Sequence, residues 1–164
     1  MTTTVVIGYD GSEAADRAVR EARAVLSAER AVLVTVWESS LPLLIDSTAG
    51  QMGSAGMMAD PATADVLDEA AKGSAHRVTA QGAALARSIG FTEVEEVVVE
   101  DASNVAITLA EEADRRRAAA IVVGSHGHGA IYSRLMGTTS SALIRHSRRP
   151  VLVVPSIAPE HRAA

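Results

Sequence analysis

Short, almost continuously apolar runs alternate along this chain with longer segments whose apolar residues recur every three or four positions. The short runs are rich in valine and isoleucine, which favour strands, and their continuity is typical of strands buried on both faces. We predict five strands, over Thr3–Tyr9, Ala31–Trp37, Glu93–Glu100, Ala118–Val123 and Val151–Val154.

The segments between the strands have the spacing of helices that bury one side. Ser12 is the expected N-cap of a first helix, which runs to about Glu29. The residues expected to face inward on this helix are Ala15, Ala18, Val19, Ala22, Val25 and Leu26.

Three further helices are predicted. Asp60-Pro61 marks the start of one that reaches Ile89 before Gly90, although Gly73 and Gly82 weaken the case for a single unbroken helix. The remaining two are a helix from the cap Ser103 to Arg116, where Arg115–Arg117 forms a basic end, and a short helix over Thr138–His146.

Strands that alternate with helices predict a parallel sheet covered on both faces, which is a doubly wound α/β domain. We expect one domain over residues 1–156, with a long loop at 38–60 and a tail at 157–164. Ligands of such sheets bind beyond the carboxyl ends of the strands. The loops expected there are residues 9–12, 37–60, 100–103 and 124–137.

Composition narrows the classes of partner. The formal net charge is −5, which gives no general attraction to nucleic acid, and the chain has no cysteine for disulfide or thiolate chemistry. No apolar run is long enough to span a bilayer, and residues 1–7 do not resemble a signal peptide. We therefore expect a cytoplasmic protein without a membrane or nucleic-acid partner.

Glycines and hydroxyl residues follow the fourth predicted strand. Gly124-Ser125-His126-Gly127 comes directly after the strand, and Gly137-Thr138-Thr139-Ser140 begins the last helix. Glycines let the backbone approach a ligand, and the amides at a helix start attract a phosphate. The alternative is that the glycines serve turns and packing, and that the hydroxyl residues only cap the helix.

Other motifs are absent or incomplete. There is no P-loop with its lysine, and no Gly-x-Gly-x-x-Gly follows the first strand. His126 and His128 lack a third metal ligand at motif spacing. A phospho-acceptor domain using Asp10 and Asp101 would need a lysine after the last strand, where Val154-Pro155 stands.

The spacing Gly124-x-x-Gly127, nine residues, then Gly137-Thr138 resembles the ATP-binding motif of the universal stress protein family. Tyr9-Asp10-Gly11-Ser12 after the first strand and Val36-Trp37-Glu38 at the end of the second are similar to that family too. So is the closing stretch over residues 149–155, and the resemblance covers essentially the whole chain.

This resemblance implies a Rossmann-like fold of the adenine nucleotide alpha hydrolase type, with strand order 3-2-1-4-5. It implies ATP as ligand, with Mg²⁺ bridging the phosphates and Asp10, and a homodimer formed through Val151–Val154. Val36 would offer backbone groups to adenine. The full set of nucleotide-site residues it implies is Tyr9, Asp10, Val36, Gly124, His126, Gly127, Gly137, Thr138, Thr139 and Ser140.

Within that set, Asp10 would lie near the ribose and the metal-bridged phosphates, and Gly124 and Gly127 would pass beneath them. Residues 137–140 would hold the β- and γ-phosphates, with Thr-Thr-Ser where the family more often has Ser-Val-Ser. The predicted function is an ATP-dependent regulator in the stress response. The alternatives are a slow ATP hydrolase or nucleotide-transferring enzyme on the same fold, and a scaffold that binds no nucleotide.

Overall fold

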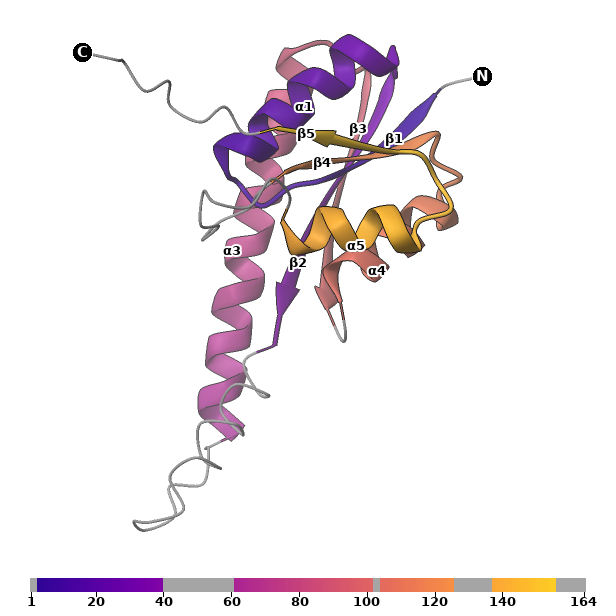
Figure 1. Ribbon diagram of the computed structural model, residues 1–164. Helices are drawn as coiled ribbons and strands as arrows, with labels where there is room; N and C mark the ends of the chain where they lie inside the picture. The colour runs from indigo at the N-terminus through magenta and orange to yellow at the C-terminus, as the bar shows by residue number, and fades with distance from the viewer. Residues whose placement is uncertain (1–2, 40–60, 102–103, 126–136, 156–164) are drawn as a thin grey trace, which may run out of the picture.

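A computed structural model describes residues 3–39, 61–101, 104–125 and 137–155. Its strands form a single parallel sheet in the order β3-β2-β1-β4-β5 (Figure 1). The α/β class and the predicted strand order are therefore confirmed. The strands are β1 (Thr4–Gly8), β2 (Arg30–Glu38), β3 (Glu93–Asp101), β4 (Ala120–Gly124) and β5 (Val151–Val154).

Helices cover both faces of the sheet, as the continuous apolar strands require. On one face lie α1 (Glu13–Leu26) and α3 (Pro61–Ser88), and on the other α4 (Val105–Arg115) and α5 (Thr138–His146). The first half of the chain adds β2 and β3 to one side of β1, and the second half adds β4 and β5 to the other side. The direction of winding therefore reverses at β1.

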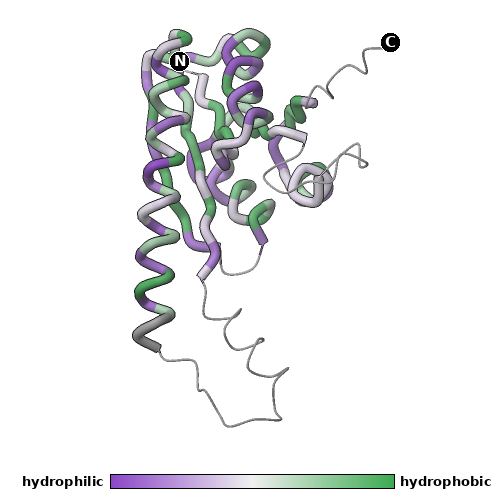
Figure 2. The backbone as a smooth tube through the Cα atoms, turned by 90° about the vertical axis from the view of Figure 1, so that its left-hand side faces the viewer, coloured by the Kyte–Doolittle hydropathy of each residue, from purple (hydrophilic) through white to green (hydrophobic). Residues whose placement is uncertain are grey.

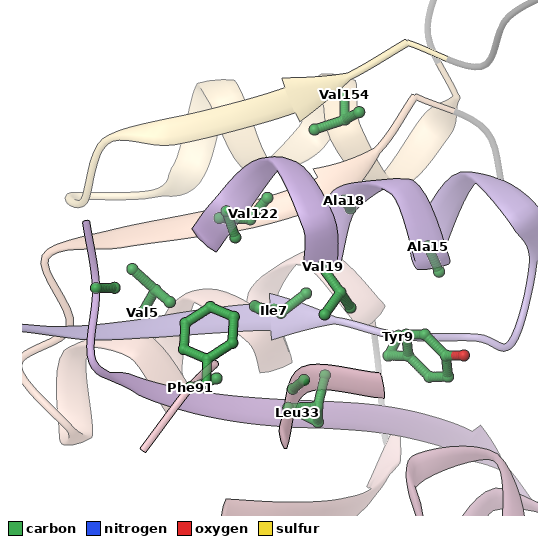
Figure 3. Close-up of a cluster of buried hydrophobic side chains, with 14 of the residues drawn as sticks. Val5, Ile7, Tyr9, Ala15, Ala18, Val19, Leu33, Phe91, Val122 and Val154 are labelled. Atoms are coloured by element: carbon green, nitrogen blue, oxygen red, sulfur yellow. The ribbon is translucent and has the colours of Figure 1, made fainter. Parts of the chain in front are cut away.

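Two separate cores result, because alternate residues of each strand point to opposite faces. Val5 and Ile7 of β1 pack under α1 and α3, whereas Val6 packs under α4 and α5. Figure 3 shows the first of these cores, with Tyr9 and Phe91 towards its two ends. Burying each large aliphatic side chain contributes about 1.5–3 kcal/mol, so these two layers dominate the stability of the sheet.

The first helix is shorter than predicted. Ser12 is its N-cap, as expected, and its hydroxyl accepts a hydrogen bond from the amide of Ala15 at 3.1 Å. The helix ends at Leu26 rather than Glu29, because Ser27 adopts a left-handed conformation with φ 47°. The predicted inward positions are buried up to Ala22, but Val25 is 60% exposed. It lies beside β5 at the edge of the sheet, where no further described strand covers it.

Two other boundaries also differ from the prediction. The cap of α4 is Asn104 rather than Ser103, which lies outside the described residues; the Asn104 side chain accepts from the amide of Ala106 at 2.9 Å. Strand β4 begins at Ala120 rather than Ala118. Arg117 has φ 51° and the amide of Ala118 donates to Ala113, so this stretch still closes the end of α4.

Helix α3 is a single helix of 28 residues, so Gly73 and Gly82 do not interrupt it. It extends beyond the end of β2, as Figures 1 and 2 both show. A β-carbon on Gly82 would lie 2.8 Å from the Tyr9 ring, so this glycine lets α3 pass close over the end of β1. Of the predicted loop at 38–60, Glu38 belongs to β2, and residues 40–60 lie outside the described part, as does the tail.

The basic end of α4 is more than a solvated cluster. Glu112 is 2% exposed and is paired with both Arg115 and Arg116. Arg116 also reaches Glu95 of β3 at 2.8 Å, and Glu95 binds Arg30 of β2 at 2.7 Å. These ion pairs connect α4 to two strands of the sheet.

None of the helices in the described ranges is long and apolar enough to cross a membrane.

The two glycines of α3 should respond oppositely to alanine. Gly82→Ala places a methyl group against the Tyr9 ring, and we expect the overpacking to lower the free energy of unfolding by about 1–2 kcal/mol. Gly73→Ala is the matched control, because its nearest neighbour is the flexible end of Arg77 at 3.7 Å. It should raise stability by about 0.5–1 kcal/mol through helix propensity. Urea unfolding measures both, and a stabilised Gly82→Ala would contradict the packing.

The ion pairs of Glu95 predict acid sensitivity. The hydrogen bond from Arg116 holds the pKa of Glu95 below its usual 4.5, although partial burial opposes this. The unfolded chain therefore binds the proton more readily. The stabilisation is complete above about pH 4.5 and is lost as the pH falls through the lower folded pKa.

Melting temperatures measured across the acidic range test this dependence. Glu95→Gln should flatten the loss of stability below the usual pKa of glutamate. Glu93→Gln is the control on the same strand, because Glu93 is more exposed and lies 3.8 Å from Arg30. Equal acid sensitivity in the wild type and in Glu95→Gln would show that the pair contributes nothing.

Candidate functional site

The carboxyl ends of β1, β2 and β4 meet at the point where the winding of the sheet reverses. β1 ends at Gly8 between its two neighbours, while β2 continues to Glu38. In doubly wound sheets this position forms the ligand crevice. The segments that follow β1 and β4 begin here, as the sequence predicted for residues 9–12 and 124–137.

The turn after β1 presents Asp10. Gly11 has φ 77°, a conformation that favours glycine, and reverses the chain into α1. One carboxylate oxygen of Asp10 accepts a hydrogen bond from the amide of Ser12 at 3.0 Å. The side chain of Asp10 is exposed at the crevice edge, so its carboxylate is accessible from solvent.

Tyr9 has a structural place beside that turn. Its side chain is 2% exposed and its hydroxyl donates to Asp16 at 2.5 Å. Burial raises the pKa of Tyr9, and the hydrogen bond to Asp16 raises it further. The ring belongs to the core under α1 and α3 (Figure 3). The predicted contact of Tyr9 with a ligand stays a prediction.

The main chain of Val36 faces the crevice. The amide of Tyr9 donates to the carbonyl of Val34 at 2.9 Å, so the polar groups of Val34 point towards β1. Polar groups of successive strand residues point to alternate sides, so those of Val36 point the same way. β1 has already ended at that level, because its register with β2 stops at the pair Gly8 and Val34. Within the described ranges β1 does not pair with these groups, so they offer a donor and an acceptor to a planar ligand.

Gly124 ends β4 under the first turn of α1. A β-carbon there would lie 2.9 Å from the Ala14 side chain and 3.1 Å from its carbonyl oxygen. Backbone cannot yield as a flexible side chain does, so packing alone requires glycine at this position. The alternative that Gly124 is a packing glycine is therefore supported, and its contact with a ligand stays a prediction.

The two halves of the glycine motif come together. Ser125 is 4% exposed, and its amide donates to Val154 of β5 at 2.8 Å. Its carbonyl accepts from the amide of Gly137 at 2.6 Å. This bond places the start of α5 directly beside the end of β4.

No side chain of the described residues caps the start of helix α5. Its N-cap is Gly137, so Thr138, Thr139 and Ser140 do not cap the helix as the alternative expected. Thr138 is exposed, whereas Ser140 is 1% exposed and its hydroxyl donates to the carbonyl of Gly137 at 3.1 Å. The first-turn amides and the positive end of the helix dipole therefore point towards the crevice.

Two predicted site residues, His126 and Gly127, lie outside the described residues. Over the ranges that are described, no three histidine or acidic side chains are grouped to hold a metal ion. A single carboxylate such as that of Asp10 can hold Mg²⁺ only together with other oxygens, which ligand phosphates would supply. That role stays a prediction.

Two residues beside the site, Thr35 and Asp16, went unnoticed in the sequence. Thr35 donates its hydroxyl to the carbonyl of Tyr9 at 2.8 Å, and Asp16 accepts from the Tyr9 hydroxyl. A buried threonine near the end of an apolar strand was the available signal for the first. Asp16 has the spacing of an ordinary exposed helix residue, so nothing in the sequence marked it.

Comparison with known proteins identifies the group to which the chain belongs. Residues 1–155 match the sequence pattern of the Universal stress protein family. The chain belongs to this family. A universal stress protein of Mycolicibacterium smegmatis is 29% identical over 151 residues, which make up 92% of this chain and 47% of that relative. One of Mycobacterium tuberculosis is 45% identical over 40 residues, or 24% of this chain and 13% of that relative. The chain thus spans at most about half the length of these two relatives.

Solved structures of the family share the fold. Universal stress protein UspA from Lactobacillus plantarum superposes with a TM-score of 0.71 at 17% identity, covering 93% of this chain and 97% of that one. A universal stress protein in complex with cAMP gives 0.61 at 25% identity, with 95% and 98% covered. A relative from Archaeoglobus fulgidus in complex with dAMP gives 0.53 at 19% identity, with 94% and 98% covered.

Proposed function

We propose that this protein binds an adenine nucleotide, ATP with Mg²⁺, in the crevice at the carboxyl ends of β1, β2 and β4. The observation that carries the proposal is the hydrogen bond between Ser125 and Gly137. It sets the start of α5, a helix of nine residues whose N-cap residue is glycine, beside the end of an inner strand. Amides and a helix dipole in that arrangement attract phosphate groups.

The rest of the crevice supports a nucleotide rather than a simple anion. The donor and acceptor of Val36 match the edge of a base, and they lie on the far side of β1 from the start of α5. Asp10 lies between them at the end of β1, where a ribose and metal-bridged phosphates would pass. Gly127 and Gly137 complete the proposed phosphate contacts, with Thr138 the exposed hydroxyl among them.

A solved relative adds support for the ligand class. The universal stress protein in complex with cAMP is 25% identical to this chain and aligned over 95% of it. Adenine and ribose are common to cAMP and ATP, so the base and sugar part of the proposed site applies to both. The assignment of a triphosphate, rather than a single phosphate, rests on the amides at the start of α5.

Regulation is the role that fits binding without an assigned catalytic group. We propose a nucleotide-dependent regulator in the stress response that acts in the cytoplasm. The alternative, slow hydrolysis or transfer of a nucleotide group, uses the same crevice, and release of phosphate from the bound ATP distinguishes it. The matched relatives are longer than this chain, so partners of their other parts are not carried over.

We further propose that two copies associate through β5. This strand pairs with β4 on one side and forms an edge of the sheet on the other. The carbonyls of Pro150 and Val154 point to β4, so the polar main-chain groups of Val151 and Val153 point outward. A groove of about 230 Å³ runs along this edge, between α1 and residues 152–155.

Titration calorimetry tests the nucleotide site. The wild type should bind ATP in the presence of Mg²⁺, and the double variant Gly127→Ala, Gly137→Ala should bind at least about tenfold more weakly, because side chains hold the phosphates away from the amides. Gly124 is unsuitable for this test, since Ala14 already requires glycine there.

Gly73→Ala is the control, a glycine variant on α3 whose nearest neighbour is the flexible end of Arg77, and it should bind ATP as the wild type does. Titration with cAMP under the same conditions separates the base and sugar contacts from the triphosphate contacts. Equal, tight ATP binding by the double variant would overturn the site, and a wild type that binds neither nucleotide would overturn the function.

Sedimentation equilibrium tests the association through β5. Val153→Pro removes an outward N–H that a second strand would use, without removing a bond to β4, and should weaken association at least about tenfold. Val153→Ala keeps the N–H and is the matched control. A dimer that is unchanged in Val153→Pro, or a monomeric wild type, would contradict this interface.

A further inference from the structure

Tyr9 lies directly before Asp10 and is held from four directions. Its amide donates to Val34 at 2.9 Å, and its carbonyl accepts from the Thr35 hydroxyl at 2.8 Å, so β2 fixes its main chain. Its ring lies against Gly82 of α3, and its hydroxyl donates to Asp16 of α1. A buried tyrosine with this many constraints has little conformational freedom.

The turn after Tyr9, which contains Asp10, is restrained by further hydrogen bonds to α1. Asp16 lies in the first turn of α1, and its own amide donates to the carbonyl of Ser12 at 3.0 Å. The amide of Ser12 in turn donates to the carboxylate of Asp10 at 3.0 Å. The chain of bonds therefore runs from the Tyr9 hydroxyl through α1 and back to the Asp10 side chain.

The Tyr9 hydroxyl also holds the carboxylate of Asp16 in place. The charges of both Asp16 and Asp10 act on the Tyr9 hydroxyl, so both carboxylates lie near it. Two carboxylates that both faced the crevice would repel a polyphosphate. The hydrogen bond turns the Asp16 carboxylate towards the Tyr9 hydroxyl, whereas Asp10 is exposed at the crevice edge.

We infer that Tyr9 and Asp16 are positioning residues: their side-chain hydrogen bond holds the turn after β1 so that Asp10 alone faces the nucleotide. This inference rests on the proposed nucleotide site and adds to it the part that prepares Asp10 before the ligand arrives. Preorganisation of this kind raises the fraction of molecules competent to bind. Tyr9 thus affects nucleotide binding only by holding Asp10 in place.

The test is a double-variant cycle on Mg²⁺–ATP affinity, measured by calorimetry. Tyr9→Phe keeps the ring against Gly82 and removes only the hydroxyl, and it should weaken binding about tenfold. In the Asp10→Ala background the same change should weaken binding less than about twofold, because the group that Tyr9 positions is gone. Equal losses in both backgrounds would mean a merely structural role and would overturn the inference.

Two further variants sharpen the cycle. Asp16→Ala removes the acceptor of the Tyr9 hydroxyl and should weaken binding about tenfold, as Tyr9→Phe does, and wild-type affinity in this variant would contradict the inference. Thr79→Val removes another buried hydroxyl, one bonded to the carbonyl of Ala75 within α3, and should leave ATP affinity unchanged. A loss in Thr79→Val equal to that of Tyr9→Phe would also count against positioning.

A measurement without nucleotide separates this inference from the proposed function. Hydrogen exchange of the Ser12 amide reports its bond to Asp10, and in the free protein it should be about tenfold faster in Tyr9→Phe than in the wild type. Thr79→Val should leave it unchanged. If the wild type binds no nucleotide but this exchange rises, the proposed function fails and the positioning of Asp10 survives. Unchanged exchange overturns the positioning itself.

Discussion

Burial of the sheet on both faces is the constraint on which the rest of this structure depends. Side chains of β1 pack under helices on either side, so neither face of the central strand is open to a ligand. Polar main-chain groups are paired along the strands and become available only where a strand ends before its neighbour. β1 ends at Gly8 while β2 continues, and that difference in length leaves the main chain of Val36 beyond the end of β1. Because helices cover both faces of the sheet, the candidate site lies at the ends of the strands.

Glycines are required where a helix passes close to the end of a strand. Gly82 admits the Tyr9 ring beneath α3, and Gly124 admits the first turn of α1 over the end of β4. Both contacts lie next to the crevice, so the packing that closes the core also sets the position of its walls. A glycine beside a ligand site can therefore serve the backbone of its own protein, and the spacing of glycines alone does not separate the two roles.

Much of the fold was accessible from the sequence because buried parallel strands are continuous apolar runs, and helix caps have a small set of residue types. The errors in helix boundaries and burial arose where the sequence carries two similar signals. Ser103 and Asn104 are both good caps, and Val25 continues the helical spacing of α1 although the sheet has ended beneath it. Within the site, the turn at Asp10 and the start of α5 were predictable. The bond between Tyr9 and Asp16 was not, because it depends on how α1 is set against the sheet.

The other edge of the sheet has a different character from β5. Five of the nine residues of β3 are acidic. Three of them, Glu93, Glu95 and Glu96, pair with arginines of β2, of α3 and of the C-cap of α4. Two such edges brought together would place rows of like charges opposite one another, which is how many proteins prevent strand addition. The charge on β3 therefore disfavours addition of a further strand at this edge, whereas β5 carries no acidic residue.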